Sequence, residues 1–102
     1  MLIIAGHLTV DPGRRDEYVG AFVDLVRRAR QAPGCLDVAV TADAVNAGRV
    51  YMYERWQSWD DVKAWRMVAN APEVDIEVTG ADVAMWDADG ERSPFTESPG
   101  VG

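Results

Sequence analysis

The sequence predicts an α+β fold of the ferredoxin-like kind, with a four-stranded antiparallel sheet and two helices on one face. Two observations predict it. Residues 2–10, 35–56 and 75–87 are rich in β-forming residues, whereas residues 14–32 and the segment after Ser58 repeat apolar side chains at helical spacing. The resulting order, β-α-β-β-α-β, is that of the split βαβ unit. A length of 102 residues is typical of one domain.

The first strand is predicted at residues 2–10, and it ends at the turn signal Asp11-Pro12-Gly13. Its even-numbered residues share one face and are mostly apolar: Leu2, Ile4, Gly6, Leu8 and Val10. Residues 14–32 are predicted as a single helix that ends at Pro33-Gly34. Four side chains form its apolar stripe: Tyr18, Phe22, Leu25 and Ala29.

Residues 35–56 predict a hairpin of two strands, 35–43 and 49–56, joined by turn residues at 44–48. The first of these strands alternates and carries its apolar side chains on one face: Leu36, Val38 and Val40. The second strand is apolar on both faces, with Val50, Met52 and Trp56 on one and Tyr51 and Tyr53 on the other.

The second helix is predicted to begin after Ser58, which is the N-cap, with Asp61 three residues later as an imperfect capping box. Its inward stripe consists of Val62, Trp65 and Ala69, and it ends before Pro72. Residues 75–87 are predicted as the fourth strand, in which Gly80 marks a bulge or a close backbone approach. Residues 1–88 thus form the expected domain, and residues 89–102 lack periodicity, as expected of a flexible tail.

The composition and charge of the chain argue against two classes of binding partner. A net charge of −7 argues against binding nucleic acid or an anionic membrane surface, because both need a basic protein surface. No apolar run reaches the roughly 18 residues of a membrane span, and the N-terminus lacks the basic region of a signal peptide. The single cysteine, Cys35, cannot form an internal disulfide and is expected to be a small buried apolar side chain. These features favour a cytoplasmic protein.

The second face of the sheet is expected to be covered. An antiparallel sheet with a free face alternates apolar and polar residues, but residues 49–56 and 81–86 are apolar on both faces. A second copy of the same sheet would cover the exposed side by two-fold symmetry. The sequence therefore predicts a homodimer through the sheet face.

Three segments together resemble the antibiotic biosynthesis monooxygenase family: PGCL at the start of the second strand, YERWQSWDDVKAW from strand into helix, and ADVAMWD in the last strand. The resemblance covers about residues 2–87. Its most recognisable part is the E-x-W-x-S step formed by Glu54, Trp56 and Ser58, which heme-degrading and non-catalytic relatives share. The resemblance implies a dimeric α+β barrel.

The resemblance also implies a pocket between sheet and helices in each subunit, which holds a small aromatic or quinol-type molecule. Family members that oxidise such molecules use no metal, flavin or other cofactor, because the deprotonated substrate reacts directly with O₂. Trp56 matches a strand tryptophan that lines this pocket in polyketide-oxidising relatives, and Trp65 stands where many members carry a helix histidine. For both tryptophans, core packing is the alternative. Further candidate pocket residues are Met52, Val62, Arg66 and Asn70.

Several positions depart from the family pattern. Met52 and Val62 stand where polyketide-oxidising relatives carry an asparagine and a tyrosine. Heme-degrading members carry an asparagine and a histidine where this chain has Gly6 and Asp75. The only histidine, His7, has the wrong parity to share a face with Gly6. Heme degradation is therefore disfavoured.

Glu54 is the first candidate for the general base, because it shares a strand face with Trp56. In an apolar pocket its carboxylate would become a stronger base. Its alternative is a structural carboxylate that pairs with Arg66 or caps backbone. Asp82 is the second candidate, with a solvated strand residue as its alternative. The activity expected is a cofactor-free monooxygenase; the alternatives are a non-catalytic small-molecule-binding dimer and a heme-binding relative.

Overall fold

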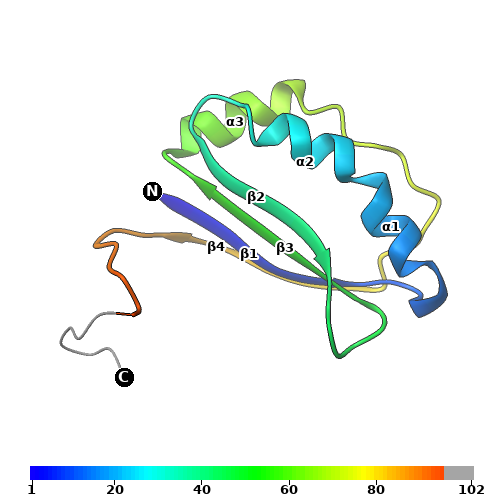
Figure 1. The fold of residues 1–102 in the computed structure, drawn as a ribbon. Helices are drawn as coiled ribbons and strands as arrows, with labels where there is room; N and C mark the ends of the chain where they lie inside the picture. Colours follow the sequence, from blue (N-terminus) through cyan, green and yellow to red (C-terminus); the bar gives the residue numbers. More distant parts are fainter. Residues whose placement is uncertain (96–102) are drawn as a thin grey trace.

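The computed structural model describes residues 1–95 and has one four-stranded sheet with a layer of helices (Figure 1). The elements in chain order are β1 (Leu2–Thr9), the 3₁₀ turn η1 (Pro12–Arg14), α1 (Arg15–Ala21), α2 (Val23–Ala29), β2 (Cys35–Ala42), β3 (Arg49–Trp56), α3 (Trp59–Val68) and β4 (Gly80–Asp87). Within these residues, each helix is too short or too polar to cross a bilayer.

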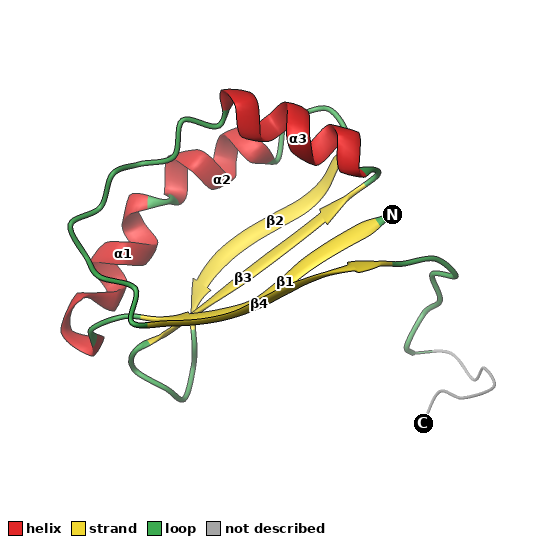
Figure 2. Cartoon of the chain, turned by 180° about the vertical axis from the view of Figure 1, so that it is seen from behind, coloured by secondary structure: helices red, strands yellow, loops and turns green. Residues whose placement is uncertain are grey.

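The strand order is β2-β3-β1-β4, and every neighbouring pair is antiparallel. All three α-helices lie on the same side of the sheet, as the view from behind also shows (Figure 2). The predicted α+β class and the β-α-β-β-α-β order are therefore confirmed. The predicted cap is confirmed too, since the Asp61 amide donates to Ser58 Oγ at 3.2 Å.

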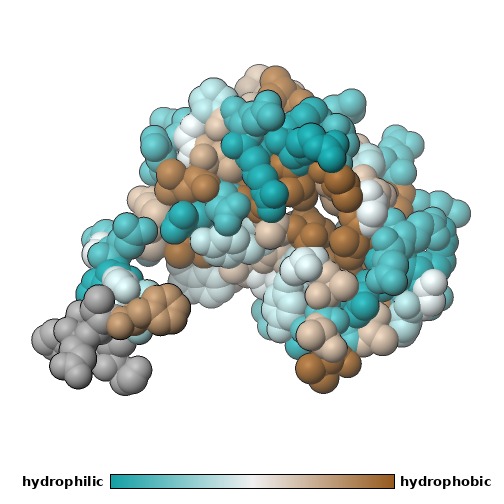
Figure 3. All heavy atoms as spheres, viewed as in Figure 1, coloured by the Kyte–Doolittle hydropathy of each residue, from teal (hydrophilic) through white to brown (hydrophobic). Residues whose placement is uncertain are grey.

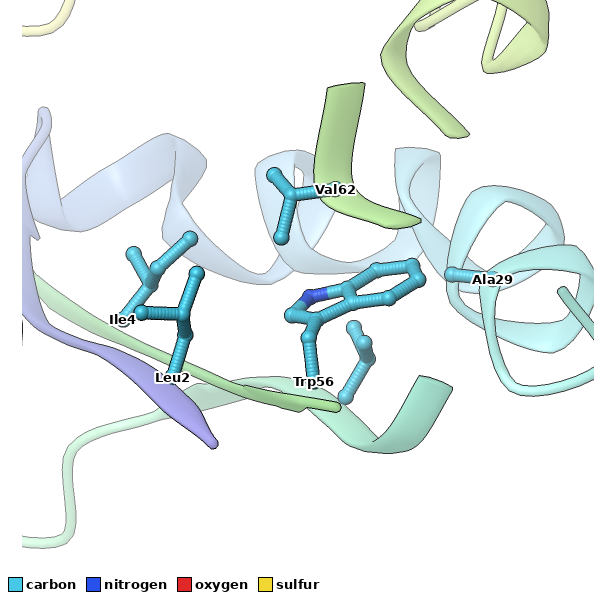
Figure 4. Close-up of a cluster of buried hydrophobic side chains, with 6 residues drawn as sticks. Leu2, Ile4, Ala29, Trp56 and Val62 are labelled. Carbon is cyan, nitrogen blue, oxygen red and sulfur yellow. The ribbon is translucent and has the colours of Figure 1, made fainter. Parts of the chain in front are cut away.

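The space between helices and sheet holds two separate clusters of buried apolar side chains. The first cluster packs at one end of the sheet (Figure 4) and contains Leu2, Ile4, Ala29, Val38, Trp56 and Val62. The second cluster contains Val10, Tyr18, Val50 and Ile76, with Phe22 and Val40 packed against it. Alternation along β3 supplies both clusters, since Val50 and Trp56 share the helix-covered face and are both fully buried.

The first helical segment is broken, so the prediction of one helix over 14–32 is wrong. η1 precedes α1, and α1 ends at Ala21. Phe22 follows as the cap, with backbone angles φ −97° and ψ 0°, before α2 begins at Val23. The Phe22 amide donates to the Val19 carbonyl at 3.1 Å, which is a tightened turn. Gly20, a poor helix former, lies in the last turn of α1 and weakens it just before the break.

Two strands also differ from the prediction. The β2–β3 register shifts between Cys35 and Asp37, which is a bulge, and Leu36 is consequently exposed rather than inward. β4 begins at Gly80 rather than at residue 75. Gly80 pairs with Thr9 in a regular register, so the bulge expected there is absent, and a Cβ at Gly80 would meet only ordinary contacts.

The face of the sheet away from the helices carries several large side chains. His7 packs edge-on against Tyr51, with 5.6 Å between ring centroids. Tyr51 and Trp86 are 39% and 53% exposed in the single chain, and Tyr53 is half-buried. The predicted parity of Tyr51 and Tyr53 is therefore confirmed, because their partners in β1 are the odd-numbered His7 and Ala5.

The described part of the tail, residues 88–95, extends away from the body after β4 (Figure 1). Two contacts connect its start to the sheet: the Ala88 amide donates to the Met1 carbonyl at 2.8 Å, and Arg55 pairs with Glu91 at 3.7 Å. Phe95 is 94% exposed. Residues 96–102 of the predicted tail lie outside the described residues, so the tail's flexibility stays a prediction.

Two glycines provide a matched test of this fold. Gly6 has φ +153°, and a Cβ built there would clash with the Asp82 carbonyl oxygen, so Gly6→Ala should lower the free energy of unfolding by about 1–3 kcal/mol. A Cβ at Gly20 would meet no atom within 4 Å. Gly20→Ala should therefore raise the free energy of unfolding by about 0.5–1 kcal/mol. Urea denaturation measures both; equal effects of the two substitutions would contradict this account of Gly6.

Cys35 packs partly against the first cluster, and its burial raises the pKa of the thiol, with further contributions from the charges of Asp37 and Glu54. A raised pKa means less thiolate at any pH below it. Alkylation of Cys35 by iodoacetamide at about pH 8 should therefore be slower than that of free cysteine. Asp37→Asn should accelerate this alkylation by removing a negative charge; an unchanged rate in that variant would mean that the Asp37 charge does not contribute to the pKa of Cys35.

Candidate functional site

A small, partly open cavity lies between the helices and the sheet, at the boundary of the two core clusters. Its volume is about 80 Å³. β2 and β3 form its floor, where the register places Val40 opposite Met52 and Val38 opposite Glu54. The described residues that line it are Phe22, Leu25, Val26, Ala29, Val38, Ala39, Val40, Met52, Glu54 and Trp65. The predicted pocket between sheet and helices therefore has a physical counterpart.

Glu54 alone carries a charged side chain among the described residues that line this cavity. The alternation of β3 turns it toward the helices, on the same face as Met52 and Trp56. Its Oε1 accepts a hydrogen bond from Trp56 Nε1 at 2.9 Å, which orients the carboxylate. The ion pair with Arg66 that the sequence suggested as an alternative is not formed by the described residues.

Trp56 is fully buried in the first core cluster (Figure 4). It is not among the residues that line the cavity. Its ring lies 6.5 Å from that of Trp65, with 29° between the planes. Trp56 is therefore one residue removed from the cavity. Its ring stacks beside Trp65 and its Nε1 donates to Glu54, and both of these residues line the cavity. Core packing, which the sequence offered as the alternative role of Trp56, accounts for its burial.

Trp65 is half-buried and lines the cavity from α3. Arg28 of α2 lies over its ring, with 5.7 Å from the guanidinium carbon to the ring centroid. The Arg28 guanidinium also donates to the Ala69 carbonyl at 2.7 Å and to Asp24 at 2.8 Å. Arg28 thereby ties α2 to the end of α3 and fixes Trp65 between them, a role that helix periodicity cannot indicate.

An open groove of about 700 Å³ lies beside the cavity, between α1, α2 and the edge strand β2. Figure 3 shows hydrophobic side chains in a hollow between the helix layer and the sheet. The groove and the cavity share four lining residues, which are Phe22, Val26, Ala39 and Val40. Two cationic side chains, Arg27 and Arg30, lie at the groove. The groove therefore offers a route from solvent to the cavity.

The remaining predicted site residues are not brought to the cavity. Val62 is a fully buried core residue. Arg66 is exposed and lies over Trp59, 5.3 Å from its ring centroid, and Asn70 is exposed after the end of α3 with φ 48°. Asp82 pairs with His7, so it belongs to the opposite face of the sheet from Glu54.

Sequence reasoning missed most of the walls. Leu25, Val26 and Ala29 come from α2, and Val38 and Ala39 come from β2. The stripe containing Phe22, Leu25 and Ala29 was a signal that these residues face inward, but periodicity does not distinguish a filled core from a cavity wall. Residues 1–95 bring together no cluster of three or more His, Cys, Asp or Glu side chains that could hold a metal.

Known structures share this architecture. An antibiotic biosynthesis monooxygenase is 20% identical, with a TM-score of 0.64 over 88% of this chain and 100% of that one. The heme-degrader MhuD from Mycobacterium tuberculosis, solved with two hemes bound in its active site, is 15% identical, with a TM-score of 0.67 over 91% and 100%. A protein from Pseudomonas aeruginosa is 17% identical, with a TM-score of 0.68 over 87% and 94%. At these identities the likeness shows the fold.

No curated protein sequence matches this chain. A sequence model of the family described as antibiotic biosynthesis monooxygenase matches residues 1–69, which run from β1 through α3 and include the Glu54–Trp56 pair and the described residues that line the cavity. By that match, the chain belongs to the antibiotic biosynthesis monooxygenase family.

Proposed function

We propose that this protein oxidises an aromatic or quinol-type small molecule with O₂ and needs no cofactor to do so. The observation that carries the proposal is an otherwise apolar cavity with one oriented carboxylate, that of Glu54. Apolar walls suit a flat ring system and exclude water, and a carboxylate held in such a site can act as a general base. Membership of the family favours this chemistry over other uses of the fold.

The proposed reaction begins with proton transfer from the substrate to Glu54. Trp56 already donates to Oε1, so the other carboxylate oxygen takes the proton. The electron-rich substrate anion then reacts with O₂. For an anthrone, the ring CH₂ becomes a carbonyl; one oxygen atom enters the product and the other leaves as water, so the substrate itself supplies all the electrons. The protein binds, deprotonates and excludes water.

The residues present do not fit a heme. The single histidine of the chain, His7, packs against Tyr51 on the sheet face away from the helices, so it cannot reach the cavity. Position 6 cannot carry a side chain without moving β4, because a Cβ there would meet the Asp82 carbonyl oxygen. A heme-binding function therefore lacks a histidine ligand at the cavity and a side chain at position 6, and no absorbance band of a bound heme should follow addition of hemin.

A small-molecule-binding dimer without catalysis is the second candidate. It is favoured by the scarcity of polar groups in the cavity, where Glu54 carries the one charged side chain among the described lining residues. It is also favoured by the hydrogen bond from Trp56, which gives Glu54 a structural role as well. Both candidate functions use the same cavity, so a measurement of substrate turnover distinguishes the monooxygenase from the binding dimer.

Glu54→Gln tests the proposed base. The substitution keeps the shape and an oxygen that can accept from Trp56, but it removes the proton acceptor. O₂ uptake with anthrone should fall by about 100-fold or more, while anthrone affinity should change much less. Asp82→Asn is the comparison, since Asp82 lies on the opposite face. A loss of turnover in that variant instead would make Asp82 the base, and absence of turnover in the unmodified protein would favour the binding dimer.

We also propose that a second copy covers the sheet face that carries Tyr51, Tyr53 and Trp86. A charge buried in such an interface without a partner is strongly unfavourable. Tyr53→Asp should therefore convert the protein from dimer to monomer in light scattering at micromolar concentration. Val45→Asp, at a hairpin-turn position that is 94% exposed, should leave the dimer intact. A monomeric unmodified protein would contradict this proposal directly.

A further inference from the structure

Phe22 stands between the groove and the cavity. It lines the open groove of about 700 Å³ and the smaller cavity of about 80 Å³. It also lines a third gap of about 10 Å³ together with Leu8, Tyr18, Val40 and Met52. Phe22 and Val40 therefore both border these three spaces.

The cavity is too small for an aromatic substrate as it stands. A space of about 80 Å³ holds roughly two or three water molecules, whereas a cavity that binds benzene measures about 150 Å³. Glu54 lies in the wall of this smaller space, whereas it does not line the groove. A ring that reaches Glu54 must therefore displace part of the wall between groove and cavity.

Among the four residues shared by groove and cavity, Phe22 is the one outside a regular element. Ala39 and Val40 are held in the β2–β3 ladder, and Val26 lies inside α2, where its amide donates to the Phe22 carbonyl at 2.9 Å. Phe22 occupies the break between α1 and α2. It is also the largest of the four side chains, so its movement opens the most space.

The surroundings of Phe22 permit that movement. Its ring is only half-buried and contacts Tyr18, with 4.9 Å between centroids and a 40° tilt. At Gly20, two residues before Phe22, a built Cβ atom would have no other atom within 4 Å. The gap beside Leu8 and Tyr18, about 10 Å³, is too small to take the ring, whereas the open groove of about 700 Å³ on its other side gives the ring space to move toward.

We propose that Phe22 is the gate between the groove and the cavity, and that its displacement controls which ring systems reach Glu54. The inference rests on the proposed function only in treating the cavity as a small-molecule site. It assigns Phe22 a role in access and ring-size selection, separate from the chemistry at Glu54.

The test is the rate at which a stable two-ring phenol, 2-naphthol, enters the protein. Quenching of tryptophan fluorescence in a stopped-flow instrument reports entry, because Trp65 lines the cavity. If opening of Phe22 limits entry, Phe22→Ala should raise the association rate constant by about tenfold. Phe22→Leu keeps an apolar side chain at the break and should give an intermediate rate, which protects the test against misfolding of the alanine variant.

Leu25→Ala is the matched control, since Leu25 lines the cavity but not the groove. It enlarges the cavity without opening the wall, so it should raise 2-naphthol affinity while changing the association rate by less than about twofold. An equal acceleration by Leu25→Ala, or an unchanged rate in Phe22→Ala, would overturn the gate. The gate would also be overturned if neither the unmodified protein nor Phe22→Ala bound 2-naphthol. O₂ uptake with anthrone is measured separately, so a protein that binds through this gate without turnover defeats only the monooxygenase proposal.

Discussion

The hydrogen bond from Trp56 to Glu54 connects the core of this protein to its cavity. Trp56 is fully buried at the end of β3, and a buried indole N–H left without an acceptor costs about 1–3 kcal/mol. The next residue on the same strand face is Glu54, and its Oε1 accepts the bond at 2.9 Å. The packing of the first core cluster thereby places a carboxylate at the cavity wall. One interaction serves both stability and the proposed chemistry, so the structural interpretation of Glu54 does not exclude the catalytic one.

Much of the fold could be predicted from the sequence because strand and helix periods are local properties. The two-residue period of 49–56 correctly separated Val50 and Trp56 from Tyr51 and Tyr53. The errors arose where tertiary packing overrides local pattern. The break at Phe22 joins two helices to two different core clusters, and the bulge at Leu36 lets β2 follow β3 with one extra residue. Neither event leaves a strong local signal.

The candidate site was only partly predictable for a related reason. Met52, Glu54 and Trp65 do line the cavity, whereas Arg66 and Asn70 are exposed and Asp82 lies across the sheet. Parity along one strand orients a side chain well, because the sheet fixes its direction. Position around a helix such as α3 depends on how that helix packs, which the sequence alone does not set. The contact of Arg28 with Trp65 and Ala69 joins residues from two helices and has no signature in either.

The location of the cavity follows from the division of the core. Its walls include Ala29, Val38 and Trp65 from around the first cluster, and Phe22 and Val40 from around the second. The side chains around a cavity of about 80 Å³ lack some of the van der Waals partners that they would have in a closed core, and this loss lowers the stability of the fold. A purely structural core would gain stability by closing this gap, so the cavity beside the oriented Glu54 carboxylate supports the proposal of a ligand site over an explanation from packing alone.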